Sequence, residues 1–530
     1  MIAKTFQGLE NVLAEELTQL GANNIQVGRR MVSYTGDQEL LYRSNFCLRT
    51  AIRVLKPIKH FRATSADEVY EAVKAIDWTK YLSNETTFAV DSVVYSTEFR
   101  HSKFVAYKVK DAIVDQFREK TGNRPNIRVT NPDIQLNMHI AEYDCTLSLD
   151  SSGESLHRRG YRQEAVEAPL NEVLAAGIIL MTGWRGETDF IDPMCGSGTL
   201  PIEATLIAKN MAPGLFRQGY AFEKWPDFNA ELFEQIYNDD SQERDFLHHV
   251  YGYDINRQAV AIAERNVKAA GLTADITIQQ QDFADFTQPA EPSIIITNPP
   301  YGERIKPEDL LGLYKMIGTQ FKKQFTDNEA WVLSYREECF DAIGLKASLK
   351  VPLFNGSLEC ELRKYQMFTG RYNEVRAEGR QIKSDDERRQ MAEKRRFKEK
   401  RVFKQGLDES DEDFEKRFER MREERRERRE FREERREMNG ERIDRPRRFD
   451  RGERPRRFDD RNEGHRGFDR RDSPRRFSRD EDDRPRRFDR DDRKSGGFRK
   501  DRDHDSKARG RDFKGGRRDF NKGRRRGYEE

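Results

Sequence analysis

The pattern of apolar and polar residues divides the chain into three stretches of different character. The first, up to about residue 150, mixes helices and strands. Apolar residues recur at helical spacing over 9–20, and Gly21 follows where a helix cap is expected. Residues 25–34 have the pattern of an extended segment, and Gly36-Asp37 predicts a turn.

A second unit is predicted within this stretch, over about 45–150. It contains a strand at 88–94 and an amphipathic helix at 104–120. The buried face of that helix is predicted to be formed by Val105, Val109, Ile113 and Phe117. Three more strands are predicted at 126–130, 133–139 and 145–150. Helices and strands mixed in this way indicate a small α+β domain.

From about residue 165 to 370, strands and helices alternate. Strands are predicted at 188–193, 250–254, 276–280, 293–297 and 330–334. Helices are predicted after the first two strands, at 200–209 and 257–270. An antiparallel pair of strands, at 347–367, ends the region. This alternation predicts an α/β fold with a doubly wound parallel sheet, whose ligand binds at the carboxyl ends of the strands.

Beyond Gly370 the globular pattern stops. Residues 376–438 are highly charged and could form a solvated helix, since many opposite charges stand four positions apart. Residues 440–530 are of low complexity and repeat the short motif Pro-Arg-Arg-Phe. Such a composition cannot bury enough apolar surface to offset the entropy of ordering, so a disordered charged tail is predicted at 371–530.

The charge of the chain is divided in the same way. Of 98 basic and 95 acidic side chains, residues 371–530 hold 58 and 44, so the total of +3 combines a tail of +14 with a body of −11. An acidic body repels RNA, and a flexible arm rich in Arg and Phe would restore nonspecific affinity through phosphate pairing and base stacking. The alternative is a solubilising segment that binds nothing.

Composition argues against several classes of protein. No apolar run approaches the roughly 18 residues that span a bilayer, and the N-terminus lacks the features of a signal peptide. The five cysteines occur singly, which argues against a zinc ribbon, an iron–sulfur cluster or a disulfide scaffold. His101, His139 and His157 show no metal-ligand spacing. We expect a soluble, cytoplasmic protein without a metal.

The octet Asp192-Pro-Met-Cys-Gly-Ser-Gly-Thr follows the first strand of the alternating region. Gly196 and Gly198 let the backbone turn sharply and approach a ligand closely. The octet is not the phosphate-binding G-x-x-x-x-G-K-[ST] loop, because no Lys follows, nor G-x-G-x-x-G, because Pro201 takes the last position. An acidic strand end beside two glycines suits a ligand with an amino acid moiety and a ribose. The alternative is a tight turn without a ligand.

A second motif, Asn298-Pro-Pro-Tyr301, follows the buried strand at 293–297. Its two prolines hold the preceding backbone extended. The Asn298 side-chain oxygen and the Pro299 carbonyl can then converge on one exocyclic NH₂ group, while Tyr301 can stack on the base that carries it. The alternative is a rigid structural corner, which the Gly-rich octet upstream disfavours.

Two further carboxylates close strands between these motifs. Asp254 can accept two ribose hydroxyls, and Asp282 can accept an adenine amino hydrogen, with Phe283 against the ring. Each carboxylate could instead be the N-cap of the helix that follows it. Together with the two loops, they describe a nucleoside pocket.

These sequence motifs resemble those of the class I S-adenosylmethionine-dependent methyltransferases. More narrowly, the chain resembles the THUMP-domain enzymes that methylate guanine N2 in bacterial large-subunit rRNA. The resemblance covers residues 1–370. It rests on five motifs that occur in the same order along the chain: Lys108-Val-Lys-Asp-Ala-Ile-Val-Asp, Leu156-His-Arg-Arg-Gly-Tyr-Arg, Ala168-Pro-Leu-Asn-Glu, Asp192-Pro-Met-Cys-Gly-Ser-Gly-Thr-Leu and Asn298-Pro-Pro-Tyr-Gly-Glu-Arg.

The resemblance implies a Rossmann-like class I methyltransferase domain, preceded by an α+β ferredoxin-like and THUMP RNA-binding region. The implied boundaries are a ferredoxin-like piece at 1–44, a THUMP domain at 45–155, the methyltransferase domain at 156–370 and the tail at 371–530. Similar members carry a second, C-terminal methyltransferase domain, so only the guanine-N2 activity is expected here. The 62 positions from Asp192 to Asp254 predict an insertion at about 210–248.

The resemblance also implies roles for individual residues. The implied cofactor is S-adenosylmethionine, and its implied contacts are Asp192, Cys195, Gly196, Ser197, Gly198, Thr199, Asp254, Asp282 and Phe283. The target base is implied to contact Asn298, Pro299, Pro300 and Tyr301. Residues of the stretch 157–172, such as Arg162 and Asn171, are expected to line the cofactor or target entrance. Lys103, Lys110 and Arg128 are candidate phosphate contacts, each with a solvated-surface role as the alternative, and Arg162 is also expected to contact RNA.

The predicted function is direct methyl transfer to N2 of a guanine in 23S rRNA or a ribosomal precursor. Asn298 is neutral, so the proton is expected to leave the amine after transfer. Cys195 stands in the cofactor loop, which disfavours a covalent role. The alternatives are a tRNA guanine-N2 methyltransferase, an enzyme acting on adenine N6 or a protein glutamine amide, and a non-catalytic RNA-binding ribosome-assembly factor.

Overall fold

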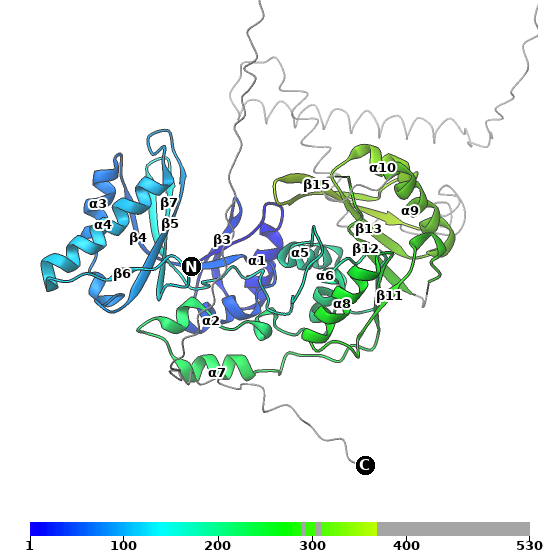
Figure 1. Ribbon diagram of the computed structural model, residues 1–530, viewed down its shortest axis with the longest axis horizontal. Coiled ribbons are helices and arrows are strands. Elements are labelled where there is room, and N and C mark those ends of the chain that lie inside the picture. Colours follow the sequence, from blue (N-terminus) through cyan, green and yellow to red (C-terminus); the bar gives the residue numbers. More distant parts are fainter. Residues whose placement is uncertain (289–291, 303–308, 368–530) are drawn as a thin grey trace, which may run out of the picture. The chain divides into compact units, whose positions relative to one another are not determined.

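A computed structural model of the protein describes residues 1–288, 292–302 and 309–367 (Figure 1). The tail predicted at 371–530 lies outside the described residues, as do Glu303 and Arg304 at the end of the family motif that begins at Asn298. The described strands form two sheets, one of eight strands and one of seven. Among the described helices, none has the length and apolar character needed to cross a bilayer.

The eight-stranded sheet belongs to the first 150 residues and has the order β2-β3-β1-β4-β8-β7-β5-β6. Its strands are β1 Ile2–Lys4, β2 Asn23–Gly28, β3 Met31–Thr35, β4 Arg53–Arg62, β5 Thr87–Tyr95, β6 Asn126–Ile127, β7 Ile134–Ala141 and β8 Asp144–Asp150. The extended segment predicted at 25–34 consists of two antiparallel strands, β2 and β3, with Arg30 at a φ of +57° in the turn.

Strand β4 joins two parts of this sheet, because it pairs antiparallel with β1 on one side and with β8 on the other. The predicted ferredoxin-like piece therefore shares one continuous sheet with the unit that follows it. The predicted domain boundaries at residues 44 and 155 stay predictions.

Four helices accompany the sheet, α1 Glu10–Gln19, α2 Gln38–Cys47, α3 Ala66–Lys74 and α4 Ser102–Thr121. The helix predicted at 104–120 is confirmed as α4, and the four apolar residues predicted to face inward are buried. Helices α2 and α3 were not predicted from the sequence pattern. Each begins with a capping side chain, because Asp37 accepts a hydrogen bond from the Leu40 N–H and Ser65 accepts one from the Glu68 N–H.

The doubly wound parallel sheet is confirmed in the second half, with the order β11-β10-β9-β12-β13-β15-β14. Its strands are β9 Asp189–Asp192, β10 Val250–Asp254, β11 Ile276–Gln280, β12 Ser293–Thr297, β13 Glu329–Ser334, β14 Leu349–Asn355 and β15 Leu358–Gln366. Strands β9 to β13 pair in parallel, and β15 is antiparallel to β13 and β14. The chain order reverses between β9 and β12, where ligands bind in such sheets.

Among the described residues of this region, the helices that accompany the sheet are α5 Glu172–Thr182, α6 Thr199–Ala208, α8 Arg257–Ala269, α9 Leu310–Gln324 and α10 Glu337–Ile343. Helix α6 is buried along its whole length. Helices α5 and α8 begin after Asn171 and Asn256, whose side-chain oxygens accept hydrogen bonds from N–H groups of the first turn.

The predicted insertion lies between α6 and β10. It contains two short 3₁₀ helices, η2 Pro213–Phe216 and η3 Ala221–Lys224, and the helix α7 Ala230–Asn238. The buried Phe222 ring stacks on Tyr42 of α2 with centroids 4.4 Å apart, and Phe233 meets the same Tyr42 ring edge-on. The insertion therefore packs against α2 of the N-terminal region through aromatic contacts.

Candidate active site

A cavity of about 660 Å³ lies at the carboxyl ends of β9, β10 and β12. Twelve of the thirteen residues predicted for the cofactor and the target base line it, Gly198 being the exception. They are Asp192, Cys195, Gly196, Ser197, Thr199, Asp254, Asp282, Phe283, Asn298, Pro299, Pro300 and Tyr301. Both predicted loops and the two intervening strand ends therefore meet at one site.

The Gly-rich octet forms a tight loop between β9 and α6. Gly196 and Gly198 have φ values of +53° and +80°, a region that residues with a Cβ rarely adopt. A Cβ added at Gly198 would lie 3.2 Å from the Cβ of Ala263 on α8. The N–H of Gly196 donates to the Asp254 carboxylate across 3.0 Å, so the loop is fastened to the end of β10.

Two carboxylates face this cavity from neighbouring strands. Asp192 is only 2% exposed, and its Oδ1 accepts a hydrogen bond from the Met194 N–H at 3.2 Å. Burial, together with a smaller contribution from the nearby Asp254 charge, raises the pKa of Asp192 to about 7. Burial also raises the pKa of Asp254. Both groups favour a ligand that brings positive charge or hydrogen-bond donors.

Asp282 and Phe283 form the next part of the wall, after β11. Asp282 is exposed, and its side chain accepts from the Ala284 N–H at 2.9 Å, so it caps the short helix η4 Phe283–Asp285. The N-cap role that the sequence offered as an alternative for Asp282 is therefore present, and Asp282 also lines the cavity. The Phe283 ring is buried and packs with Phe286 and Phe325.

The Asn298-Pro-Pro-Tyr loop also lines the cavity. The Asn298 Oδ1 atom is buried and accepts no hydrogen bond within the described part of the chain. A buried acceptor without a hydrogen bond costs free energy. Such an atom is therefore typical of a site where a ligand supplies the donor. The Tyr301 hydroxyl accepts a hydrogen bond from Asn355 Nδ2 at 2.6 Å, and its ring meets Tyr335 edge-on at 5.6 Å.

Several lining residues were missed in the sequence. Residues 355–358 form the turn between β14 and β15, and Leu313 and Met316 come from α9. Asn355-Gly356 is a recognisable hairpin turn signal. Its sequence position gives no indication that the turn reaches the loop at Tyr301, 54 residues earlier.

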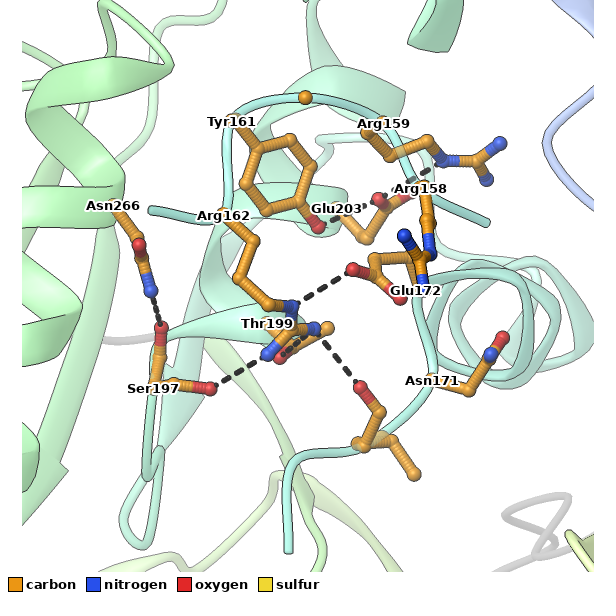
Figure 2. Close-up of polar contacts among 12 residues, drawn as sticks. Arg158, Arg159, Tyr161, Arg162, Asn171, Glu172, Ser197, Thr199, Glu203 and Asn266 are labelled. Atoms are coloured by element: carbon orange, nitrogen blue, oxygen red, sulfur yellow. Dashed lines mark hydrogen bonds and ion pairs between the residues drawn. The ribbon is translucent and has the colours of Figure 1, made fainter. Parts of the chain in front are cut away.

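Arg162 and Asn171 are absent from the cavity wall. The Arg162 guanidinium binds side chains and backbone around the Gly-rich loop (Figure 2). Asn171 caps α5. The stretch 157–172 does reach the cavity, but through Val166 to Leu170.

The other predicted RNA contacts lie in the N-terminal half. Lys103 and Arg128 are exposed. Lys110 is paired with Asp111 at 2.9 Å and lies over the Tyr107 ring at 5.4 Å.

Cys195 is buried, and burial raises the pKa of its thiol well above the ordinary value. A raised pKa lowers the fraction of thiolate, which opposes nucleophilic chemistry. Over residues 1–288, 292–302 and 309–367, no group of three His, Cys, Asp or Glu side chains could hold a metal ion.

Comparison with protein families gives three matches along the chain. Residues 1–55 match a ferredoxin-like domain model, residues 63–150 a THUMP domain, and residues 159–364 an RMKL-like methyltransferase domain. The third match contains the whole cavity described above.

Curated relatives give the same picture. The chain is 40% identical over 369 residues to a putative RNA methyltransferase of Synechocystis, a match that covers 69% of this chain and 96% of the relative. It is also 40% identical over 380 residues to a ribosomal RNA large subunit methyltransferase K/L of Syntrophotalea carbinolica, covering 69% of this chain and 53% of the relative. The chain thus spans about half the length of that K/L relative.

Among solved structures, the chain is similar to SMU.472, a putative methyltransferase complexed with SAH. The TM-score is 0.63 and the identity 30%, and the match covers 70% of this chain and 98% of the other.

Proposed function

This chain belongs to the family of S-adenosylmethionine-dependent RNA methyltransferases that carry a THUMP domain and an RMKL-like methyltransferase domain, and on that premise we propose that it methylates the exocyclic N2 of a guanine in 23S rRNA. The family resemblance drawn from the sequence motifs is confirmed. The observation that best supports the proposal is the buried Asn298 oxygen, which accepts no hydrogen bond from the described residues and belongs to a residue that lines the same cavity as the Gly-rich loop.

The residues present fit the cofactor of this family. When bound, S-adenosylmethionine supplies an electrophilic methyl group on a positively charged sulfur. Asp192, buried at the end of β9, would accept a hydrogen bond from the amino group of the cofactor. Asp254 would accept from its ribose hydroxyls, and Asp282 from the adenine amine.

The proposed chemistry relies on acceptors rather than on a base. A guanine amine is a poor nucleophile because its lone pair is delocalised into the ring. Asn298 Oδ1 and the Pro299 carbonyl would each accept one N–H of the amine, which favours a pyramidal nitrogen with its lone pair directed at the methyl group. Asn298 cannot take up the proton, which leaves after transfer. Tyr301 would stack on the base.

The substrate base must leave its stack, or be unpaired already, to enter this cavity. We propose that the THUMP-matched region contributes RNA affinity, with Lys103 and Arg128 as exposed phosphate contacts. The Arg-rich tail would add nonspecific affinity. The choice of 23S rRNA rests on the K/L relatives, whose names place their activity on large-subunit rRNA.

The test is an assay of the purified full chain with labelled S-adenosylmethionine and separate transcripts of 23S rRNA and tRNA. Digestion to nucleosides identifies the methylated product. We expect N2-methylguanosine from 23S rRNA. Product from tRNA alone would move the substrate to the tRNA alternative, N6-methyladenosine would overturn the choice of base, and no product from either RNA would favour an assembly factor.

A further inference from the structure

Arg162 makes four hydrogen bonds around the Gly-rich loop, shown in Figure 2. Its Nη1 donates to the Ser197 hydroxyl and its Nη2 to the Thr199 hydroxyl, both at 2.9 Å. On the other side, Nε donates to Glu172 at 2.8 Å and Nη2 to the Leu170 carbonyl at 3.0 Å. One side chain therefore connects the loop before α6 with the start of α5.

Asn266 holds the same loop from the opposite side. This residue of α8 is fully buried, and its Nδ2 donates to the Ser197 carbonyl at 2.9 Å and to the Glu164 carbonyl at 3.0 Å. Its Oδ1 accepts from the N–H groups of Gln163 and Glu164. Ser197 is thus fixed at its hydroxyl by Arg162 and at its carbonyl by Asn266.

Neither Arg162 nor Asn266 lines the cavity, whereas the loop residues that they hold, Ser197 and Thr199, do. Ser197 stands between the two glycines whose positive φ values define the loop. Glycine leaves the backbone of this loop free to adopt other conformations. The conformation seen here therefore depends on the contacts of the surrounding residues.

The pair of Arg162 and Glu172 is largely withdrawn from solvent, with side-chain exposures of 17% and 6%. Solvent screening of this pair is therefore weak, and removal of the arginine would leave a buried carboxylate without its partner. A guanidinium carries five donors in a planar fork, so it can reach Glu172, Ser197 and Thr199 together. A lysine ammonium could keep the charge but not all four contacts.

We propose that Arg162 is a positioning residue that holds the Gly-rich loop in the form that receives S-adenosylmethionine, and that it is not an RNA contact as the sequence suggested. Asn266 completes the same support. The inference rests on the proposed cofactor site, since it assigns to that site the residues that preorganise it.

Arg158 offers a matched control in the same segment. It is exposed and paired only locally, with Glu154 at 2.6 Å. Arg159, in contrast, is buried and pairs with Glu203 at 3.4 Å, so its substitution would disturb the core. Arg158→Ala therefore removes one nearby positive charge without touching the loop.

The test compares the full-length wild type, Arg162→Ala, Arg162→Lys and Arg158→Ala. Calorimetry measures the Kd of S-adenosylhomocysteine, filter binding measures affinity for transcribed 23S rRNA, and hydrogen exchange follows residues 193–199. We expect Arg162→Ala to weaken the binding of S-adenosylhomocysteine about tenfold, or by roughly 1.4 kcal/mol. The same substitution should speed amide hydrogen exchange in the loop. Arg162→Lys should recover part of this loss. RNA affinity should be unchanged in all variants, and Arg158→Ala should match the wild type.

Two results would overturn the inference. Weaker RNA binding with an unchanged Kd for S-adenosylhomocysteine would make Arg162 an RNA contact. An unchanged Kd together with unchanged loop exchange would limit it to general stability. Absence of S-adenosylhomocysteine binding by the wild type would instead contradict the proposed function itself, so the two failures are distinguishable.

Discussion

The side-chain amide of Asn355 donates a hydrogen bond to the hydroxyl of Tyr301 across 2.6 Å. The contact joins the turn between β14 and β15 to the loop after β12. Tyr335 meets the same Tyr301 ring edge-on, with an interplanar angle of 81°. The ring proposed to stack on the target base is therefore oriented by two residues that follow it in the sequence.

This relationship predicts that Tyr301→Phe and Asn355→Ala have similar effects. Each removes the same hydrogen bond and keeps the other residue, so kcat/KM for RNA methylation should fall by about three- to tenfold. The double variant should be no worse than either single variant, since both act through one contact. Additive losses in this cycle would show that the two residues work separately. The Kd of S-adenosylhomocysteine serves as the control and should not change.

The raised pKa of Asp192 predicts pH-dependent cofactor binding. With a pKa of about 7, this carboxyl is mostly neutral at pH 6 and mostly ionised at pH 8. A ligand with an ammonium group prefers the ionised form, so S-adenosylhomocysteine should bind roughly tenfold more tightly at pH 8 than at pH 6. Asp192→Asn should bind weakly and lose this dependence. A wild-type Kd that is constant over this range would contradict the proposed contact.

The aromatic contact between the insertion and α2 predicts a large stability effect. Phe222 is fully buried and stacks on Tyr42. Phe222→Ala should lower the free energy of unfolding by roughly 3–5 kcal/mol, measured by urea denaturation. Leu247→Ala is the control, because Leu247 is 91% exposed, and should change stability by no more than about 0.5 kcal/mol. Equal stability of the two variants would mean that the insertion does not support the fold.

The tail hypothesis predicts a change in salt dependence. Residues 371–530 carry a net charge of +14 against −11 for the remainder. Truncation after Gly370 should weaken binding to 23S rRNA by roughly tenfold at low salt and flatten the plot of log affinity against log salt. An unchanged affinity and slope would make the tail a solubilising segment.

The methyltransferase half was predictable because its strands are short, apolar and bounded by chemically specific loops. The bounds predicted at 276–280 and 293–297 are those of β11 and β12. In parallel sheets the carboxyl ends of neighbouring strands share one edge, so Asp192, Asp254 and Asn298 could be brought together from the sequence pattern alone.

The remaining features depend on contacts that no local pattern records. Arg162 carries a charge in the sequence, which suggested RNA, but its partners Ser197 and Thr199 stand 35 and 37 positions away. Asn355 reaches Tyr301 through antiparallel pairing of β14 and β15. The helix at Gln38–Cys47 was missed because it is buried on several sides and has weak amphipathic periodicity.

Methylation of 23S rRNA by this protein is tested most directly by nucleoside mass spectrometry of 23S rRNA and tRNA from cells that lack this gene, complemented with wild type or with Asn298→Ala. We expect one N2-methylguanosine to disappear from 23S rRNA and to return only with the wild type. Asn298→Ala should still bind S-adenosylhomocysteine, since it lacks only the acceptor for the target amine. Full restoration of the methyl group by Asn298→Ala would contradict the role of Asn298, and an unchanged 23S rRNA in the deletion strain would contradict methylation of this RNA by the protein.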